Sequence, residues 1–93
     1  VDAGVFALVA EKIPATLGAA LAKECPVPVI GIGSGPEVDG QILVTQDMLG
    51  LFDRFRPRFV RRYLELGQTI RSAVESYGKD VRNGSFPGED ESY

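Results

Sequence analysis

The chain has 93 residues, of which 44% are hydrophobic, so it can bury one small core and forms one domain at most. Its formal net charge of −3, with acidic and basic residues interspersed, supplies no basic field for nucleic acid, and no apolar run approaches the ~20 residues of a membrane span. The absence of histidine removes the commonest general base and metal ligand, while the single Cys25 favours a reducing compartment, so we expect a cytoplasmic protein.

The N-terminal third of the chain has the pattern of two strands joined by a helix. The apolar residues Val5–Ala10 predict the first strand, and Val29–Ile32 predict the second. Between them, Pro14–Glu24 predicts a helix, because proline suits the first turn and the next residues are rich in alanine and leucine. Pro26 and Pro28 end that helix. The β-α-β order predicts that the two strands are parallel.

A glycine-rich segment, Gly31-Ile32-Gly33-Ser34-Gly35, closes the second strand. A nucleotide-binding loop is disfavoured, because the third glycine comes too early for a dinucleotide fingerprint, Pro36 follows it, and no Lys-Ser or Lys-Thr pair comes next. We interpret these glycines as positions where the backbone turns tightly and a ligand or a neighbouring loop approaches. A third strand is predicted over Gln41–Thr45, after which Asp47–Phe52 leaves the sheet.

The strongest helical pattern lies beyond Pro57, where apolar residues recur at steps of three and four. We expect a long amphipathic helix whose stripe packs against other protein: Phe59, Tyr63, Leu66, Ile70, Ala73, Val74, Tyr77 and Val81. Asn83-Gly84 ends the helix, and residues 84–93 form a polar, acidic tail.

A dense basic run surrounds the predicted start of this helix: Arg54, Arg56, Arg58, Arg61 and Arg62. We interpret the run as a solvated face or as a source of salt bridges to a neighbouring subunit. Anion binding is the alternative.

Glu11 is the candidate catalytic residue, because it follows an apolar run directly and so ends a buried strand. Catalytic groups of parallel sheets lie where the strands emerge, at their carboxyl ends. The spacing alone favours a structural role instead, as a cap of the following helix or as the partner of Lys12 or an outside arginine. Asp39 and Asp47 bracket the third strand, and turn or helix-cap roles are favoured over metal binding. We assign no metal ligand and no cofactor-binding residue to this chain.

Four segments together resemble the ketopantoate hydroxymethyltransferase family: Ala7–Pro14, Val29–Pro36, Asp39–Val44 and Phe86–Glu89. The family pattern at the first segment is an apolar strand, a glutamate, two variable residues and a proline, here Glu11-Lys12-Ile13-Pro14. The resemblance covers the chain from Gly4 to Tyr93. Lys12, Ser34, Gln46 and Glu91 depart from the residues that are common in the family.

The resemblance implies an α/β fold, namely the C-terminal part of a (βα)₈ TIM barrel of the phosphoenolpyruvate mutase and isocitrate lyase type. This part comprises the last three strands plus the C-terminal helices. We therefore expect residues 1–93 to be the C-terminal portion of a single barrel domain. A whole barrel needs roughly 250 residues, so the remaining barrel strands or subunits come from elsewhere. The first residue is not Met and the chain enters an apolar run directly, which agrees with a fragment.

The implied reaction transfers a hydroxymethyl group from 5,10-methylenetetrahydrofolate to 3-methyl-2-oxobutanoate, giving 2-dehydropantoate for pantothenate and coenzyme A synthesis. In that scheme Mg²⁺ polarises the 2-oxo acid, Glu11 takes the proton from its third carbon as general base, and the enolate attacks the one-carbon unit. The resemblance implies that the Mg²⁺ ligands lie on absent strands, so we expect the isolated chain to be inactive. Because the family forms large homo-oligomers, the alternative is a noncatalytic fragment whose long helix serves assembly.

Overall fold

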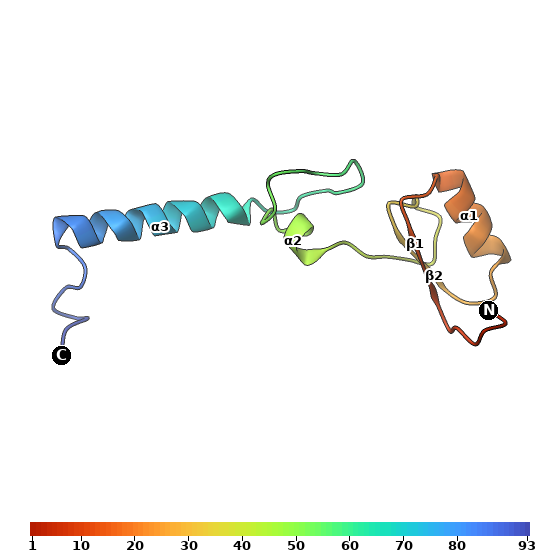
Figure 1. The fold of residues 1–93 in the computed structure, drawn as a ribbon, viewed down its shortest axis with the longest axis horizontal. Coiled ribbons are helices and arrows are strands. Elements are labelled where there is room, and N and C mark those ends of the chain that lie inside the picture. Colours follow the sequence, from red (N-terminus) through yellow and green to blue (C-terminus); the bar gives the residue numbers. More distant parts are fainter.

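The computed structural model describes all of residues 1–93 and contains three strands and three helices (Figure 1). In chain order these are β1 (Leu8–Glu11), α1 (Ala15–Glu24), β2 (Val29–Ile32), β3 (Gly40–Gln41), α2 (Thr45–Met48) and α3 (Leu66–Asn83). The strands form one sheet in the order β1-β2-β3, and both pairings are parallel. The parallel sheet with its helices confirms the predicted α/β class.

β1 and β2 pair residue by residue, from Leu8 opposite Val29 to the last residue of each strand. Both predicted ends of the second strand are confirmed, whereas the first strand begins at Leu8 rather than at Val5. The reason lies in the partner strand. The carbonyl of Pro28 accepts a hydrogen bond of 2.9 Å from the Leu8 N–H, but proline has no N–H to continue the ladder. Residues 5–7 therefore lie outside the sheet.

β3 is shorter than the sequence predicts, because its partner strand ends. β3 pairs with the middle of β2, which stops at Ile32. The next residue, Gly33, has φ of 67° and turns the backbone away from the sheet. The prediction of a strand over Gln41–Thr45 is therefore wrong beyond its first residue, and Thr45 instead begins α2.

α1 confirms the predicted helix, with Pro14 at its N-cap and Glu24 as its last residue. The helix approaches the sheet closely at Gly18, which is buried. A methyl group at this position would overlap the backbone carbonyl oxygen of Ser34. The close contact between α1 and the turn after β2 therefore requires glycine at position 18.

α3 begins at Leu66, later than the apolar stripe predicts. The preceding segment bonds to residues around α2 instead. The Tyr63 N–H donates to the Met48 carbonyl at 2.8 Å, and the Leu66 N–H donates to the Leu49 carbonyl at 2.9 Å. The prediction that Phe59 and Tyr63 belong to the long helix is therefore wrong.

The end of α3 is where the sequence predicts it. Gly84 follows Asn83 with φ of 79°, the left-handed conformation that closes many helices. The tail then turns back, and the ring of Phe86 packs edge to face on Tyr77 with the ring centroids 5.5 Å apart. Residues 84–93 thus contact the helix that they follow.

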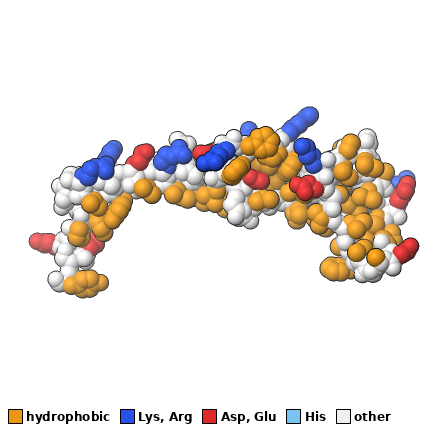
Figure 2. Space-filling view, in the orientation of Figure 1, with side chains coloured by type: hydrophobic (Ala, Val, Ile, Leu, Met, Phe, Trp, Pro, Cys, Tyr) orange, Lys and Arg blue, Asp and Glu red, His pale blue; other side chains and the backbone are white.

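The buried apolar core is small and lies mainly in the sheet: Ala10, Val29, Ile32 and Val60. No residue of α3 is buried, and the helix stretches away from the sheet (Figure 1). The chain is therefore 65 Å long, with a radius of gyration of 21.8 Å, against about 12 Å for a compact domain of similar length. Figure 2 shows apolar side chains along one side of α3 and basic ones along the other. None of the helices combines the length and the apolarity that crossing a membrane requires.

We expect the 93-residue chain on its own to unfold gradually or to self-associate. Only 8 of its 93 residues are buried, so hydrophobic burial offsets little of the conformational entropy lost on folding. Open strand edges and the apolar side of α3 favour self-association. Sedimentation and thermal circular dichroism, measured on one sample, check this expectation. A monomer with a sharp, reversible melt would contradict it.

Candidate active site

Glu11 lies at the carboxyl end of β1, as predicted, opposite the last residue of β2, Ile32. Its side chain is exposed. The next residue, Lys12, has φ of 50°, in the left-handed region that long side chains rarely adopt. This conformation costs about 1–2 kcal/mol. The left-handed φ of Lys12 turns the chain sharply directly after Glu11. The Lys12 N–H still donates a hydrogen bond to the Ile32 carbonyl at 2.9 Å.

Two glycines of the turn after β2 allow other segments to approach this strand edge. Gly33 and Gly35 have φ of 67° and 83°. A Cβ atom on Gly33 would lie 2.7 Å from the ring of Phe59, and one on Gly35 would lie 2.5 Å from the Cβ of Ala15. The first glycine thus admits a neighbouring loop and the second admits α1. This confirms the interpretation of the glycine-rich segment as a place of close approach.

Ser34, between these glycines, ties the turn to β1. The side chain is fully buried, and its hydroxyl donates to the Ala10 carbonyl at 2.6 Å. A buried hydroxyl without a partner would cost about 1–3 kcal/mol, so the bond satisfies a group that has no access to water. Because Ala10 directly precedes Glu11, the bond holds the end of β1 against the turn after β2.

Residues 51–62, which we call the arginine loop, contain the five arginines of the basic run. The loop closes on itself at a narrow neck. Besides the two bonds from Tyr63 and Leu66, the Gly67 N–H donates to the Gly50 carbonyl at 3.1 Å. The ends of the loop therefore lie next to each other, although most of its residues are exposed. The prediction that these arginines surround the start of the long helix is wrong, since α3 begins after the loop.

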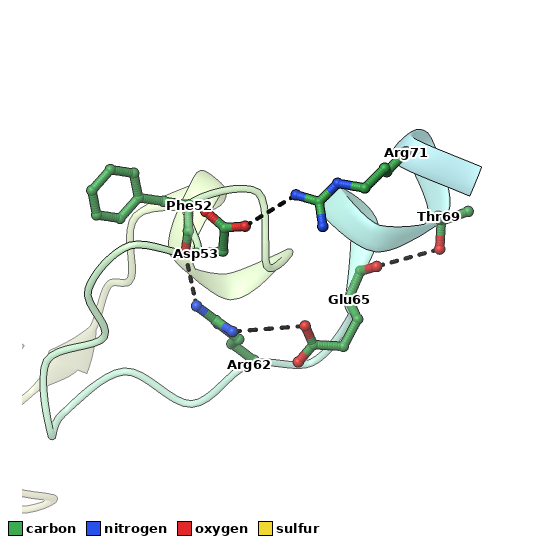
Figure 3. Close-up of polar contacts among 6 residues, drawn as sticks. All are labelled: Phe52, Asp53, Arg62, Glu65, Thr69 and Arg71. Atoms are coloured by element: carbon green, nitrogen blue, oxygen red, sulfur yellow. Dashed lines mark hydrogen bonds and ion pairs between the residues drawn. The ribbon is translucent and has the colours of Figure 1, made fainter. Parts of the chain in front are cut away.

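Two arginines brace the neck (Figure 3). The Arg62 guanidinium donates to the Phe52 carbonyl at 2.8 Å and lies 3.7 Å from the Glu65 carboxylate. Arg71 of α3 pairs with Asp53 at 3.4 Å. The Arg71 pair is largely exposed and contributes at most about 1 kcal/mol. The Arg62 side chain is only 17% exposed, and its buried Nε atom has no hydrogen-bond partner. Arg62 is thus the more buried of the two braces, and its unpartnered Nε offsets part of what its other contacts contribute.

The arginine loop reaches back to the sheet and borders an open cavity of about 830 Å³ beside Glu11. We call it the Glu11 cavity. Its walls include the end of β1, the glycine turn and the loop: Glu11, Lys12, Gly33, Phe55, Arg58 and Phe59. A volume of this size, with apolar walls and a few charged groups, is typical of small-molecule sites.

The two aspartates next to β3 lie in different settings, and α2 has no side-chain capping bond. The Asp39 carboxylate accepts a bond of 2.8 Å from the Val29 N–H at the start of β2. Asp47 lies in the first turn of α2. Neither lines the Glu11 cavity. No three His, Cys, Asp or Glu side chains come together in the chain as a candidate metal-binding cluster.

Phe55, Arg58 and Phe59 are cavity residues that the sequence patterns did not predict. Phe59 fits the apolar spacing of the long helix, and Arg58 belongs to the run interpreted as a solvated face. The glycine pair that flanks the loop allows its two ends to meet, but it does not place these residues at the cavity. A Cβ atom on Gly67 would lie 2.9 Å from the Gly50 carbonyl oxygen, so this pair lets the two segments meet.

Comparison with known proteins assigns the family. The family model described as ketopantoate hydroxymethyltransferase matches residues 1–89. The chain belongs to this family. A relative named 3-methyl-2-oxobutanoate hydroxymethyltransferase, from Chlorobaculum tepidum, is 59% identical over 92 residues, which are 99% of this chain and 33% of the relative. Proteins of the same name from Prosthecochloris aestuarii and Wolinella succinogenes are 60% and 58% identical over 99% of this chain, covering 33% and 35% of their own lengths. This ketopantoate hydroxymethyltransferase family member thus spans about a third of the length of the curated relatives it matches.

We expect Arg62→Met in the complete protein to loosen the neck of the arginine loop. The change removes the bond to the Phe52 carbonyl but also removes the unpartnered Nε, so global stability changes little. Local opening should become about tenfold more frequent, the equivalent of one hydrogen bond. Hydrogen exchange of the Leu66 and Gly67 amides, which close the neck, measures this. Arg61→Met is the matched control, and equal exchange in both variants would contradict the bracing role.

Proposed function

We propose that this chain forms the part of a 3-methyl-2-oxobutanoate hydroxymethyltransferase that supplies the general base, Glu11. The curated relatives carry that name. The observation that carries the proposal is the place of one carboxylate. Glu11 ends a parallel strand at its carboxyl edge and lines a cavity of ligand size.

We propose in addition that residues 1–93 belong to a single (βα)₈ barrel domain and supply its last three strands. Parallel sheets are normally covered on both faces, because their crossover connections place helices there. In this chain Val9, in the middle of β1, is 64% exposed. β1 and β3 each have a free edge. We propose that further strands and helices of the same barrel cover Val9 and pair with the free edges of β1 and β3.

In the proposed reaction Glu11 removes the proton from the third carbon of 3-methyl-2-oxobutanoate. The electron pair of that C–H bond moves into an enolate. The enolate carbon then forms a C–C bond with the methylene carbon of 5,10-methylenetetrahydrofolate, whose two C–N bonds break. Water supplies the hydroxyl group, and its second proton together with the proton taken from the substrate ends on the two folate nitrogens, giving 2-dehydropantoate and tetrahydrofolate. This product places the enzyme in pantothenate and coenzyme A synthesis.

Mg²⁺, which we assign to ligands on the remaining strands, would supply charge stabilisation for the enolate. Glu11 is exposed within the 93 residues, so we assign the exclusion of water from the base to the remaining strands. We propose a cytoplasmic setting, because Cys25 is a free thiol and reducing compartments keep thiols in that state.

A noncatalytic role in assembly is the second candidate, and α3 supports it. Four apolar residues on α3 recur at three- and four-residue steps and are 47–63% exposed: Ile70, Val74, Tyr77 and Val81 (Figure 2). A row of this kind suits burial against another subunit, and we propose a homo-oligomer. If assembly is the sole role of the chain, neutralising Glu11 leaves the activity of the complex unchanged.

Glu11→Gln in the complete protein should slow removal of the substrate proton by roughly 10²–10⁴-fold, the range for general base catalysis. Glutamine keeps the size and the hydrogen-bonding reach of the side chain but has no basic lone pair. The measurement is loss of the C3 proton signal of 3-methyl-2-oxobutanoate in deuterated water, with Mg²⁺ present and folate absent. These conditions separate enolate formation from one-carbon transfer.

Glu37→Gln is the matched control, because Glu37 is an exposed glutamate that does not line the Glu11 cavity. Its proton exchange should match that of the parent protein. Parent-like exchange in Glu11→Gln would show that another group is the base. Glu11 would then have the structural role that its spacing alone favours.

A further inference from the structure

The Glu11 cavity contains more positive than negative charge. Glu11, Lys12 and Arg58 are its charged lining residues, so a net positive charge remains even when the carboxylate is ionised. Neither cation takes part in an ion pair or a side-chain hydrogen bond within the chain. The ion pairs use Arg62 and Arg71 instead. Lys12 and Arg58 are exposed and free to meet an anion.

Two phenylalanines of the arginine loop stand beside these cations. The ring of Phe59 packs against Gly33 so closely that a Cβ atom on residue 33 would not fit. Phe55 lines the same cavity and is 68% exposed, so its ring is open to a ligand there. Flat apolar walls next to cations match a ligand that joins a ring to a carboxylate.

We propose that Arg58 and Lys12 bind a carboxylate of a ligand whose aromatic segment lies against Phe55 and Phe59. The inference rests on the proposed function, which supplies two substrates. 3-Methyl-2-oxobutanoate has a carboxylate but no ring, whereas the folate joins an aromatic ring to a glutamate through its aminobenzoyl-glutamate part. The geometry therefore assigns Arg58 and Lys12 to the folate, as binding residues and not as groups that react.

Arg58 and Lys12 would contact the carboxylate of the folate in different ways. The planar guanidinium of Arg58 can donate two parallel hydrogen bonds to one carboxylate. The ammonium of Lys12 acts as a point charge. Arg58 is carried by a loop whose neck is closed by backbone bonds, and Lys12 by the turn that directly follows Glu11. Binding of the folate would thus join the arginine loop to the strand that carries the base.

The test uses the complete protein, with steady-state kinetics for each substrate. Arg58→Gln and Lys12→Gln should each raise the KM for 5,10-methylenetetrahydrofolate by roughly 10- to 100-fold, the range for losing a charge-assisted hydrogen bond. The KM for 3-methyl-2-oxobutanoate should stay at its parent value. In Arg58→Gln, exchange of the C3 proton without folate should also be unchanged. A merely structural defect would alter all three quantities.

Arg54→Gln is the matched control, since Arg54 is an exposed arginine of the same loop that does not line the cavity. It should leave the KM for the folate unchanged. Parent-like values in Arg58→Gln would overturn the proposal. An equal rise in Arg54→Gln would also overturn it, because the loop would then act through its total charge.

Direct binding separates this proposal from the proposed function. p-Aminobenzoyl-glutamate should bind the parent protein and lose affinity in Arg58→Gln, while Phe55→Leu should weaken this ligand but leave free glutamate unaffected. A parent protein that binds it through Arg58 but transfers no hydroxymethyl group disproves the function alone. A parent that transfers the group and shows no dependence on Arg58 disproves the binding role alone.

Discussion

The parallel pairing of β1 with β2 is the constraint on which the rest of the site depends. The register places Glu11 opposite Ile32, so both strands end at one edge of the sheet. The bond from the Lys12 N–H to the Ile32 carbonyl and the bond from the Ser34 hydroxyl to the Ala10 carbonyl hold that register on both sides of Glu11. A slip by one residue would turn every side chain of β1 to the opposite face and remove the carboxylate from the cavity.

Elements with strong local signals could be predicted from the sequence. Prolines and alanines define α1, Gly84 ends α3, and the apolar run Val29–Ile32 is β2 in full. The errors occur where a boundary depends on a partner. Pro28 delays the start of β1, and the end of β2 shortens β3. Neither effect is present in the residues of the affected strand itself.

The candidate site also contains residues with a local sequence signal and residues whose position depends on distant contacts. The position of Glu11 at the end of β1 could be predicted, because a charge directly after an apolar strand is a local feature. Arg58 and Phe59 could not, since they reach the cavity through the neck at Gly50 and Gly67 and through the contact of Phe59 with Gly33. Their apolar and basic spacing continues without a break into α3, which conceals the loop. Contacts between distant glycines carry no periodic signal.

Lys12 combines a strained backbone with a positive charge beside the proposed base. Its left-handed backbone costs about 1–2 kcal/mol, and the hydrogen bond to Ile32 returns about 1 kcal/mol of that. Glycine would adopt φ of 50° without the strain and would keep the bond, because the bond uses only the backbone. What glycine lacks is a cation beside Glu11. The positive charge at the cavity is therefore the property that the lysine side chain adds at this strained position.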